Sequence, residues 1–485
     1  MRRRTPFRVP RVPAVVVVAL LAFVNSSVWA FITPNYLAPD EESHIGYVVQ
    51  LAEHGKPPRD DSRNPFYTSE MNALAAGMNT YDMLQFANAT RPPWSKTRVR
   101  AYEALVAQGQ ARDNGGGPST ASVHGPVYYA VPALAYRIFY GTSFLDRLLA
   151  MRLASAVLAA LTVAFVFATV RELAPSRPWA AAAAALLVAF QPMFGFIEGA
   201  VNADVGVNLA GAILIYLLIR AFRRDLTLGV AIAIPATFIL GVLAKATMFA
   251  YVPVLAFALA VLLWRRSGGW REWLAMGATG AVLAAAWAVL APAWHHSYIP
   301  VPGGGSGVAG QAPGLGAKLS YIWQVFLPPL PFMHHDFAAG VHPVWDIYVM
   351  RLWGDFGWLD VVMPHVVFVA IAVAMVAIAL LALRGLWLER ELVRRRIPET
   401  LLLIGSLVCV LGFTHAAFAK FNPTSPIQEQ GRYAFPAITV LAVIAITACF
   451  GLGRRRAPVA GVVLVAAMMA LSGFAQLYVF SSYFT

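Results

Sequence analysis

The segment PDEESH, residues 39–44, places carboxylates and an imidazole close together. Asp40 precedes His44 by four residues and Glu41 precedes it by three, so on a helix these side chains share one face. A carboxylate beside an imidazole can act as a general base or bind a metal ion. A structural role is the alternative, because Asp40 is a suitable helix N-cap and an acidic first turn complements the positive helix end. The six residues alone leave both interpretations open.

The rest of the chain is strongly apolar. Of its 485 residues, 59% are hydrophobic and 13% are charged. This composition predicts an all-α integral membrane protein. Runs long enough to cross a bilayer, roughly 18 to 25 residues each, predict about eleven transmembrane helices, within bounds of about ten to thirteen. The predicted spans lie at about 13–33, 148–170, 178–197, 203–221, 226–243, 246–264, 272–293, 361–384, 399–419, 432–451 and 457–481.

The arginines orient these spans. If the amino terminus is cytoplasmic, every short arginine-rich connection falls on one side, including those at Arg2, Arg171, Arg223, Arg265 and Arg454. The positive-inside rule therefore predicts a multi-pass protein of the cytoplasmic (inner) membrane with its working face outside. The net charge of +13 is explained by this topology, and no nucleic-acid partner is expected.

This threading divides the chain into five predicted regions. They are a cytoplasmic basic tail with the first span (1–33), a first outer loop carrying surface helices and carboxylates (34–147), a central transmembrane bundle (148–293), a second outer loop rich in glycine and aromatic residues (294–360), and a C-terminal transmembrane bundle (361–485). We expect the first span to be kept rather than cleaved as a signal peptide after Ala30, because the apolar run continues through Ile32.

Two shorter segments of the first outer loop predict helices at the membrane surface. Residues 41–54 carry an apolar stripe with helical spacing and end at Gly55, so we expect a helix lying flat against the bilayer. Residues 124–141 are apolar but too short to cross easily and contain Pro132, which favours an interfacial or re-entrant helix.

Polar residues at the ends of the spans converge on the same predicted outer face. The candidate substrate-binding residues are His44, His124, Arg147, Arg152, Asn202, Asp204, Lys245, Gln430, Arg432 and Tyr433, and Asp40 and Glu41 are the candidate catalytic residues. Each has a structural alternative: Asp204 could simply pair with Lys245, Arg432 could reach lipid headgroups, and Asn202 could cap its helix. Since ionisable groups at membrane depth usually pair or serve a substrate, we expect one shared pocket. Its cations suit a phosphate and its carboxylates suit a base.

The order of these motifs resembles the GT-C superfamily of polyprenyl-phosphate-dependent glycosyltransferases, in a bacterial multi-pass branch with PDE..H and QGRY elements. The resemblance rests on PDEESH, HGPVYY, the arginines of RLLAMRLASAVLAAL, the N.D pair at Asn202 and the late QGRYAFPA, and it runs over about residues 13 to 450. The superfamily's HPPL.Y element is matched at His124, but Gly125 stands where proline is usual. No WWDYG signature of oligosaccharyltransferases is present, which favours transfer of a single sugar.

The resemblance implies a GT-C fold and inverting transfer of a hexosyl or pentosyl unit. The donor would be a polyprenyl-phosphate sugar, and the acceptor a cell-wall glycan, lipid or protein on the outer face. Carried over to this sequence, the acidic catalytic role falls on Asp40 or Glu41. On charge, we expect Lys245 and Arg432 to bind the phosphate, with Arg147 or Arg152 as a third cation, and Asp40 to act as the base, with Glu41 second.

Other functions stay open. A transporter or lipid flippase would also place charges in a multi-span bundle, but it predicts polar residues at the midplane and repeated broken spans, whereas the span centres here are almost purely apolar. A catalytically inactive cell-envelope scaffold is the third alternative. We expect no metal site, although the histidines of FMHHDF (residues 332–337) are noted and a divalent cation, Mg²⁺ or Mn²⁺, is kept as an open cofactor.

Overall fold

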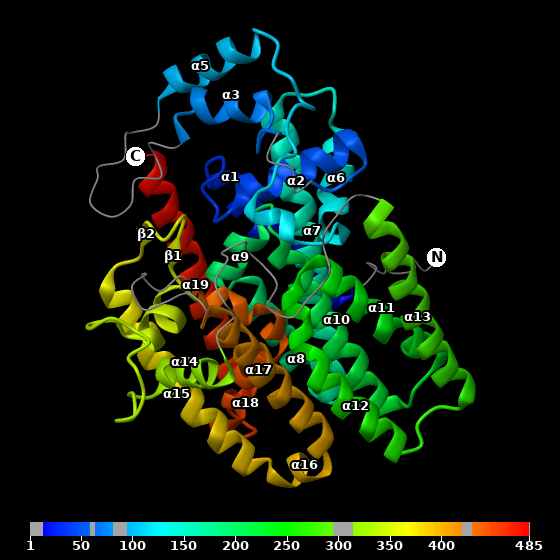
Figure 1. Ribbon diagram of the computed structural model, residues 1–485. Helices are drawn as coiled ribbons and strands as arrows, with labels where there is room; N and C mark the ends of the chain where they lie inside the picture. Colours follow the sequence, from blue (N-terminus) through cyan, green and yellow to red (C-terminus); the bar gives the residue numbers. More distant parts are fainter. Residues whose placement is uncertain (1–12, 59–63, 81–94, 294–313, 420–428, 485) are drawn as a thin grey trace, which may run out of the picture.

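The computed structural model describes residues 13–58, 64–80, 95–293, 314–419 and 429–484, and within them the fold is almost entirely helical (Figure 1). The N-terminal and outer helices are α1 (Ala14–Ile32), α2 (Glu41–His54), α3 (Ser69–Gly77), α5 (Lys96–Val106), η1 (Thr120–Val123) and α6 (Val127–Ile138). The central helices are α7 (Phe144–Leu173), α8 (Pro178–Ala189), α9 (Pro192–Glu198), α10 (Ala203–Arg224), α11 (Leu228–Ala244), η2 (Ala246–Tyr251), α12 (Val252–Trp264) and α13 (Trp270–Ala293). The C-terminal helices are α14 (Leu315–Phe326), η3 (Trp345–Met350), α15 (His365–Leu388), α16 (Arg390–Arg395), α17 (Ile397–Phe418), η4 (Gly431–Ala437), α18 (Ile438–Gly451) and α19 (Ala457–Phe484). The described strands are β1 (Asp355–Phe356) and β2 (Val361–Val362), which pair antiparallel with Asp355 opposite Val362.

The predicted all-α membrane class is confirmed, whereas the predicted number of spans is not. Among the described residues, nine helical segments are long and apolar enough to cross a bilayer. A tenth exists if α8 and α9, which are bent by 65° at their junction, form one broken span. The run expected at 226–243 becomes α11, an apolar helix of 17 residues that is shorter than each of the nine candidate spans. A continuous α-helix satisfies its own backbone hydrogen bonds, so it is the element that apolar runs form in lipid.

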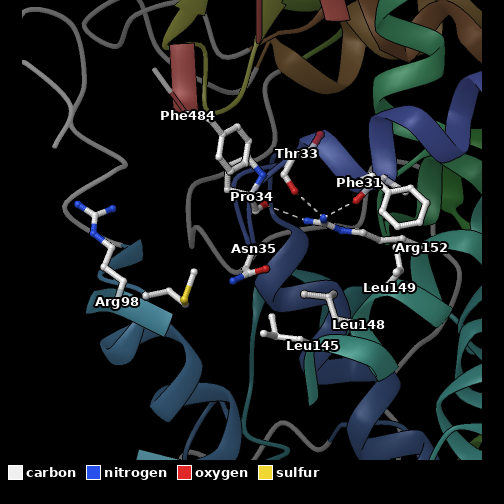
Figure 2. A pocket seen from close by; sticks show the side chains of 12 residues that line it. Phe31, Thr33, Pro34, Asn35, Arg98, Leu145, Leu148, Leu149, Arg152 and Phe484 are labelled. Atoms are coloured by element: carbon white, nitrogen blue, oxygen red, sulfur yellow. Dashed lines mark hydrogen bonds between the residues drawn. The ribbon is translucent and has the colours of Figure 1, made fainter. Parts of the chain in front are cut away.

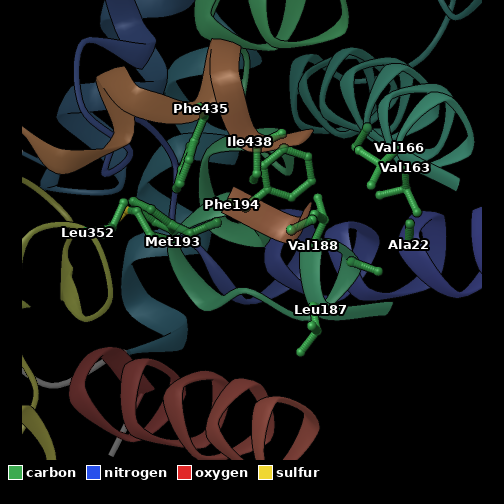
Figure 3. Packing of buried hydrophobic residues seen from close by; sticks show 14 of the residues in the cluster. Ala22, Val163, Val166, Leu187, Val188, Met193, Phe194, Leu352, Phe435 and Ile438 are labelled. Carbon is green, nitrogen blue, oxygen red and sulfur yellow. The ribbon is translucent and has the colours of Figure 1, made fainter. Parts of the chain in front are cut away.

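The core of the bundle is built on small side chains. Helix α8 contributes a run of alanines, of which Ala180, Ala181, Ala184 and Ala185 are fully buried. Small residues let neighbouring helices approach closely, and α1, α7, α18 and α19 all pack against α8. Figure 3 shows larger side chains of the same core, among them Val163 of α7, Phe194 of α9 and Ile438 of α18.

The outer helices α2, α3, α5 and α6 gather at one end of the bundle, and the arginine-rich α16 lies at the other (Figure 1). Helix α2 has the predicted bounds, and Gly55 ends it in the left-handed conformation. The apolar stripe of α2 contacts other helices of the protein rather than lipid. Its residues Ser43 to Val49 are all buried, because α6 and η1 pack against it. Helix α6 has 12 residues. It would span roughly 18 Å, which is too short to cross and agrees with an interfacial or re-entrant helix.

Candidate active site

Three breaks between membrane helices bring opposite charges together. Asp204 lies in the first turn of α10, Lys245 follows the last residue of α11, and Arg432 is the second residue of η4. The Lys245 ammonium donates a hydrogen bond to Asp204 Oδ1, and Arg432 Nε lies 3.4 Å from Asp204 Oδ2. Two cations from distant segments therefore share one buried carboxylate. Both also contact the ring of Tyr433, with Lys245 Nζ 5.2 Å and Arg432 Cζ 5.3 Å from its centroid.

Arg432 retains unused hydrogen-bonding capacity. Its side chain is only 2% exposed, and its Nη1 atom is buried with no hydrogen-bond partner among the described residues. A buried guanidinium group without a full set of acceptors is unfavourable, so this position suits an additional anion.

Two glycines allow the backbones around this cluster to approach. A Cβ atom on Gly211 of α10 would lie 2.2 Å from the carbonyl oxygen of Pro436, so glycine here lets η4 rest directly on α10. A Cβ atom on Gly125 would lie 2.2 Å from the carbonyl oxygen of Leu243. The segment that carries His124 therefore packs against the end of α11, next to Lys245. Proline at position 125 would make the same clash.

His44 and His124 border the cluster as a parallel pair. Their ring centroids are 5.9 Å apart with an interplanar angle of 9°, and Tyr129 Oη lies 2.7 Å from His44 Nδ1. Burial, and then the neighbouring Lys245, lower the pKa of His124 to about 3. Burial, and then His124 and Lys245, also hold the pKa of His44 well below its usual value. Both imidazoles are therefore neutral near pH 7 and offer hydrogen bonds rather than charge.

Asp40 adopts an unusual backbone conformation at the start of α2. It has φ 59° and ψ 9°, in the left-handed region, and its side chain makes no hydrogen bond to the N-terminus of α2. The helix-cap interpretation therefore does not describe Asp40. Its carboxylate lies within electrostatic range of Arg432. The preceding carbonyl, of Pro39, accepts a 3.2 Å hydrogen bond from Asn202 Nδ2.

Asn202 acts as a link between two parts of the site. Its Oδ1 atom accepts a hydrogen bond from the backbone N–H of Asp204 at 2.9 Å, which caps α10. Its Nδ2 atom holds the segment before Asp40. These two bonds involve both ends of the amide, so Asn202 links the start of α10 to the segment before Asp40.

Glu42 is a largely buried carboxyl group beside Asp40 and Glu41, whereas the sequence suggested only a favourable interaction with the helix end. Its Oε2 atom is buried and has no hydrogen-bond partner in the described parts of the chain. Burial, followed by the negative charges of Asp40 and Glu41, raises the pKa of Glu42 to about 7. The signal available in the sequence was the run of three consecutive carboxylates, because like charges in close contact cannot all ionise easily.

Glu41 and Arg152, both expected at the substrate, instead bind each other. Arg152 Nε and Nη2 donate to the two Glu41 oxygens at 2.8 and 2.6 Å. Figure 2 shows the same guanidinium group beside Thr33 and Pro34, whose carbonyl oxygens it contacts at 2.6 and 2.9 Å. Glu41 also accepts a hydrogen bond from the N–H of Val201 at 3.2 Å. With their polar atoms engaged, these two residues join α1, α2 and α7, which argues against a base at Glu41 or a phosphate at Arg152.

Arg147 is likewise engaged away from the cluster. Its Nη2 lies 2.5 Å from Glu70 Oε1, and its Nη1 donates to the Tyr136 hydroxyl at 2.6 Å. These contacts attach α3 to the start of α7.

Gln430 is half-buried and precedes η4, where its carbonyl oxygen accepts from the N–H of Tyr433 at 3.2 Å.

A second buried polar group holds the start of η4. Glu429 Oε1 lies 2.6 Å from His415 Nδ1, and Glu429 Oε2 accepts a 3.1 Å hydrogen bond from the Tyr321 hydroxyl. Arg351 donates to the Glu429 carbonyl oxygen at 2.8 Å. The backbone that leads into Arg432 is therefore anchored from α14, η3 and α17 together.

Within the described part of the chain, no group of three or more histidine, cysteine, aspartate or glutamate side chains is arranged to hold a metal ion. Asp336 of the FMHHDF segment accepts hydrogen bonds from Ser320 at 2.7 Å and Gln324 at 2.5 Å. These hydrogen bonds give the Asp336 carboxylate a structural role.

Comparisons with known proteins place the chain in a family. Two similar solved structures are ArnT from Cupriavidus metallidurans bound to undecaprenyl phosphate and the oligosaccharyltransferase of Archaeoglobus fulgidus in the apo form. The first has 15% identity and a TM-score of 0.44, with 93% of this chain and 63% of that chain covered. The second has 14% identity and a TM-score of 0.49, with 97% and 56% covered, so this chain spans less than two thirds of either structure. No curated protein matches the sequence. Residues 23–442 match the family described as "Predicted membrane protein (DUF2142)", and the chain therefore belongs to this family of multi-pass membrane proteins.

Proposed function

We propose that this protein is a membrane glycosyltransferase of the GT-C type that transfers one sugar from a polyprenyl-phosphate donor to an acceptor hydroxyl. The observation that carries this proposal is the junction of Asp204, Lys245 and Arg432 at one end of the bundle, opposite the arginine-rich α16, with Asp40 within electrostatic range of Arg432. By the positive-inside rule this end faces away from the cytoplasm. The motif order that resembles the GT-C superfamily supports the same function.

Lys245 and Arg432 are the proposed phosphate ligands. Both are positively charged, they come together through Asp204, and Arg432 has a buried donor still available. As the bond between the anomeric carbon and the phosphate oxygen breaks, negative charge grows on the leaving prenyl phosphate. Fixed cations stabilise that charge more in the transition state than in the bound donor, which lowers the barrier.

Asp40 is the proposed general base. In the reaction, the acceptor oxygen forms a bond to the anomeric carbon, its proton passes to the Asp40 carboxylate, and prenyl phosphate leaves with the bonding electrons. Attack from the side opposite the phosphate inverts the configuration at that carbon. Asp40 suits this role because its carboxylate does not cap α2 and is half-buried rather than sealed.

The neutral imidazoles of His44 and His124 are proposed to bind sugar hydroxyl groups. Because neither carries a charge near pH 7, they do not compete with the phosphate ligands for the anion. Tyr433, whose ring already lies against both cations, is a suitable flat surface for the sugar.

A reconstituted assay tests this function. The purified protein in liposomes is given a polyprenyl phosphate that carries a tritiated pentose or hexose, together with an extract of membrane glycans and lipids as acceptor. We expect sugar transfer and release of free polyprenyl phosphate in equal amounts. Movement of intact donor across the bilayer without cleavage would instead identify a flippase, and neither activity with any donor would favour an inactive scaffold.

The pH dependence of transfer offers a separate prediction. The pKa of Glu42 is raised to about 7, so the carboxyl group loses its proton as the pH rises from 6 to 8. We expect the ionised form of Glu42 to be the one that supports removal of the acceptor proton, so the rate should rise about tenfold over this interval. In Glu42→Gln the rise should disappear, whereas Glu103→Gln, at an exposed position on α5, should retain it. A wild-type profile in Glu42→Gln would remove Glu42 from the site.

A further inference from the structure

The end of the bundle opposite the cluster of Asp204, Lys245 and Arg432 has a groove of its own. A cavity of about 290 Å³ opens between the ends of α7, α15, α17 and α18. Its walls are almost entirely apolar, and at its mouth the side chains of Leu386, Ile404 and Val408 are 37%, 51% and 61% exposed. These helices are membrane spans, so the mouth faces the hydrocarbon region of the bilayer. At this depth in the bilayer, the molecule that can occupy such a groove is the acyl chain of a lipid.

Charged side chains line one end of this groove. They are Arg177, Arg396, Glu389 and Glu399. Glu389 is occupied by Arg454, which donates to both of its oxygens at 2.8 Å, and Arg177 stands farther away at 3.6 Å. Arg454 thus neutralises most of the negative charge of Glu389, even without Arg177.

Arg396 lies among like charges. Burial, and then the nearby guanidinium group of Arg223, lower the pKa of Arg396, and Arg177 adds to this effect while Glu399 opposes it. Four guanidinium groups, of Arg177, Arg223, Arg396 and Arg454, therefore face two carboxylates, of Glu389 and Glu399. The excess positive charge sits at the end of a groove that admits a lipid chain.

We propose that this groove binds an anionic phospholipid, with an acyl chain between α15 and α17 and the phosphate at Arg177 and Arg396. The arginine-rich end of the bundle is the one that the positive-inside rule assigns to the cytoplasmic leaflet, where anionic phospholipids are abundant. Basic pockets between membrane helices on that side are suited to such headgroups. The site is separate from the proposed glycosyltransferase site, and it stands whether or not that function holds.

Binding is measured on the full chain in neutral-lipid nanodiscs. Phosphatidylglycerol or phosphatidylcholine with identical acyl chains is added, and bound lipid is counted by native mass spectrometry while thermal unfolding is followed in parallel. We expect phosphatidylglycerol to stay bound and to raise the midpoint of unfolding, and phosphatidylcholine to do neither. Arg396→Gln should weaken phosphatidylglycerol binding about tenfold or more, because a charge-assisted contact to the phosphate is lost.

Matched variants separate this site from general surface charge. Arg394→Gln, two residues away and paired on the surface with Glu391, should bind phosphatidylglycerol as the wild type does. Arg396 also donates to the Leu173 carbonyl, so its replacement could unfold the protein. Val408→Trp fills the mouth of the groove from a lipid-facing position and should reduce binding without loss of folding. Equal binding of both lipids, equal losses in Arg394→Gln and Arg396→Gln, full binding by Val408→Trp, or displacement of phosphatidylglycerol by equimolar polyprenyl phosphate would each overturn the proposal.

Discussion

Asp40→Asn should reduce sugar transfer by about 10²–10⁴-fold, the range expected when a general base is removed. The variant keeps the shape of the side chain and cannot accept the acceptor's proton. Asparagine tolerates the left-handed conformation that residue 40 adopts at φ 59°, so the backbone that leads into α2 has no reason to change. Asn would also serve equally well as a helix cap, and a purely structural role for Asp40 therefore predicts an active variant. The measurement is the transfer rate at saturating donor, with the unfolding midpoint as the check on folding.

Glu41→Gln is the matched comparison, since it makes the same change one residue away. Glu41 is fully buried against Arg152, and neutralising it leaves that guanidinium group without its counterion. Breaking one half of a buried ion pair typically costs about 3–5 kcal/mol, so this variant should lose thermal stability first and activity as a consequence. If Asp40→Asn is stable but inactive while Glu41→Gln is unstable, Asp40 is the base and Glu41 is the structural carboxylate. Wild-type turnover by Asp40→Asn would remove Asp40 from the mechanism.

The sequence could predict the helices and the end of the bundle at which the site forms. Long apolar runs and the one-sided distribution of arginine depend on local composition alone. They were sufficient to expect Asp204, Lys245 and Arg432 near one another, although more than two hundred residues separate the first from the last. The geometry of the site agrees with that expectation, while the roles of these residues stay predictions until activity is measured.

The pairing of individual charges could not be predicted in this way. Arg147 and Arg152 looked equivalent to Lys245 in charge and depth, but their partners Glu70 and Glu41 lie 77 and 111 residues away in sequence. The left-handed conformation of Asp40 at the start of α2 is likewise specified by no composition rule. The same limit explains α2, whose apolar stripe is as compatible with a membrane surface as with the protein core that actually covers it.

Arg432→Gln should raise the KM for the donor by about 10–100-fold and should also lower kcat. The reason is that one charge-assisted contact to the phosphate contributes about 1.5–3 kcal/mol. A contact that strengthens as the phosphate leaves affects kcat, whereas one made equally to the bound donor affects only KM. Arg432→Lys keeps the charge but loses the planar fork, so it should recover part of the binding and little of the rate. Arg100→Gln, at an exposed position on α5, is the control and should change neither constant.

Lys245→Gln distinguishes a phosphate site from a purely structural ion pair. Lys245 and Arg432 share Asp204, so in a structural triad the loss of either cation would lower stability while donor affinity in the folded fraction stayed constant. At a phosphate site both variants should weaken binding of polyprenyl phosphate itself, measured without any acceptor. The affinity of the wild type for polyprenyl phosphate should also fall as the salt concentration rises. Asp204→Asn frees both cations from their shared carboxylate, so it should bind polyprenyl phosphate at least as tightly as the wild type even though its fold is weakened. Unchanged affinity in both cation variants would leave the charges at this end of the bundle as a structural network alone.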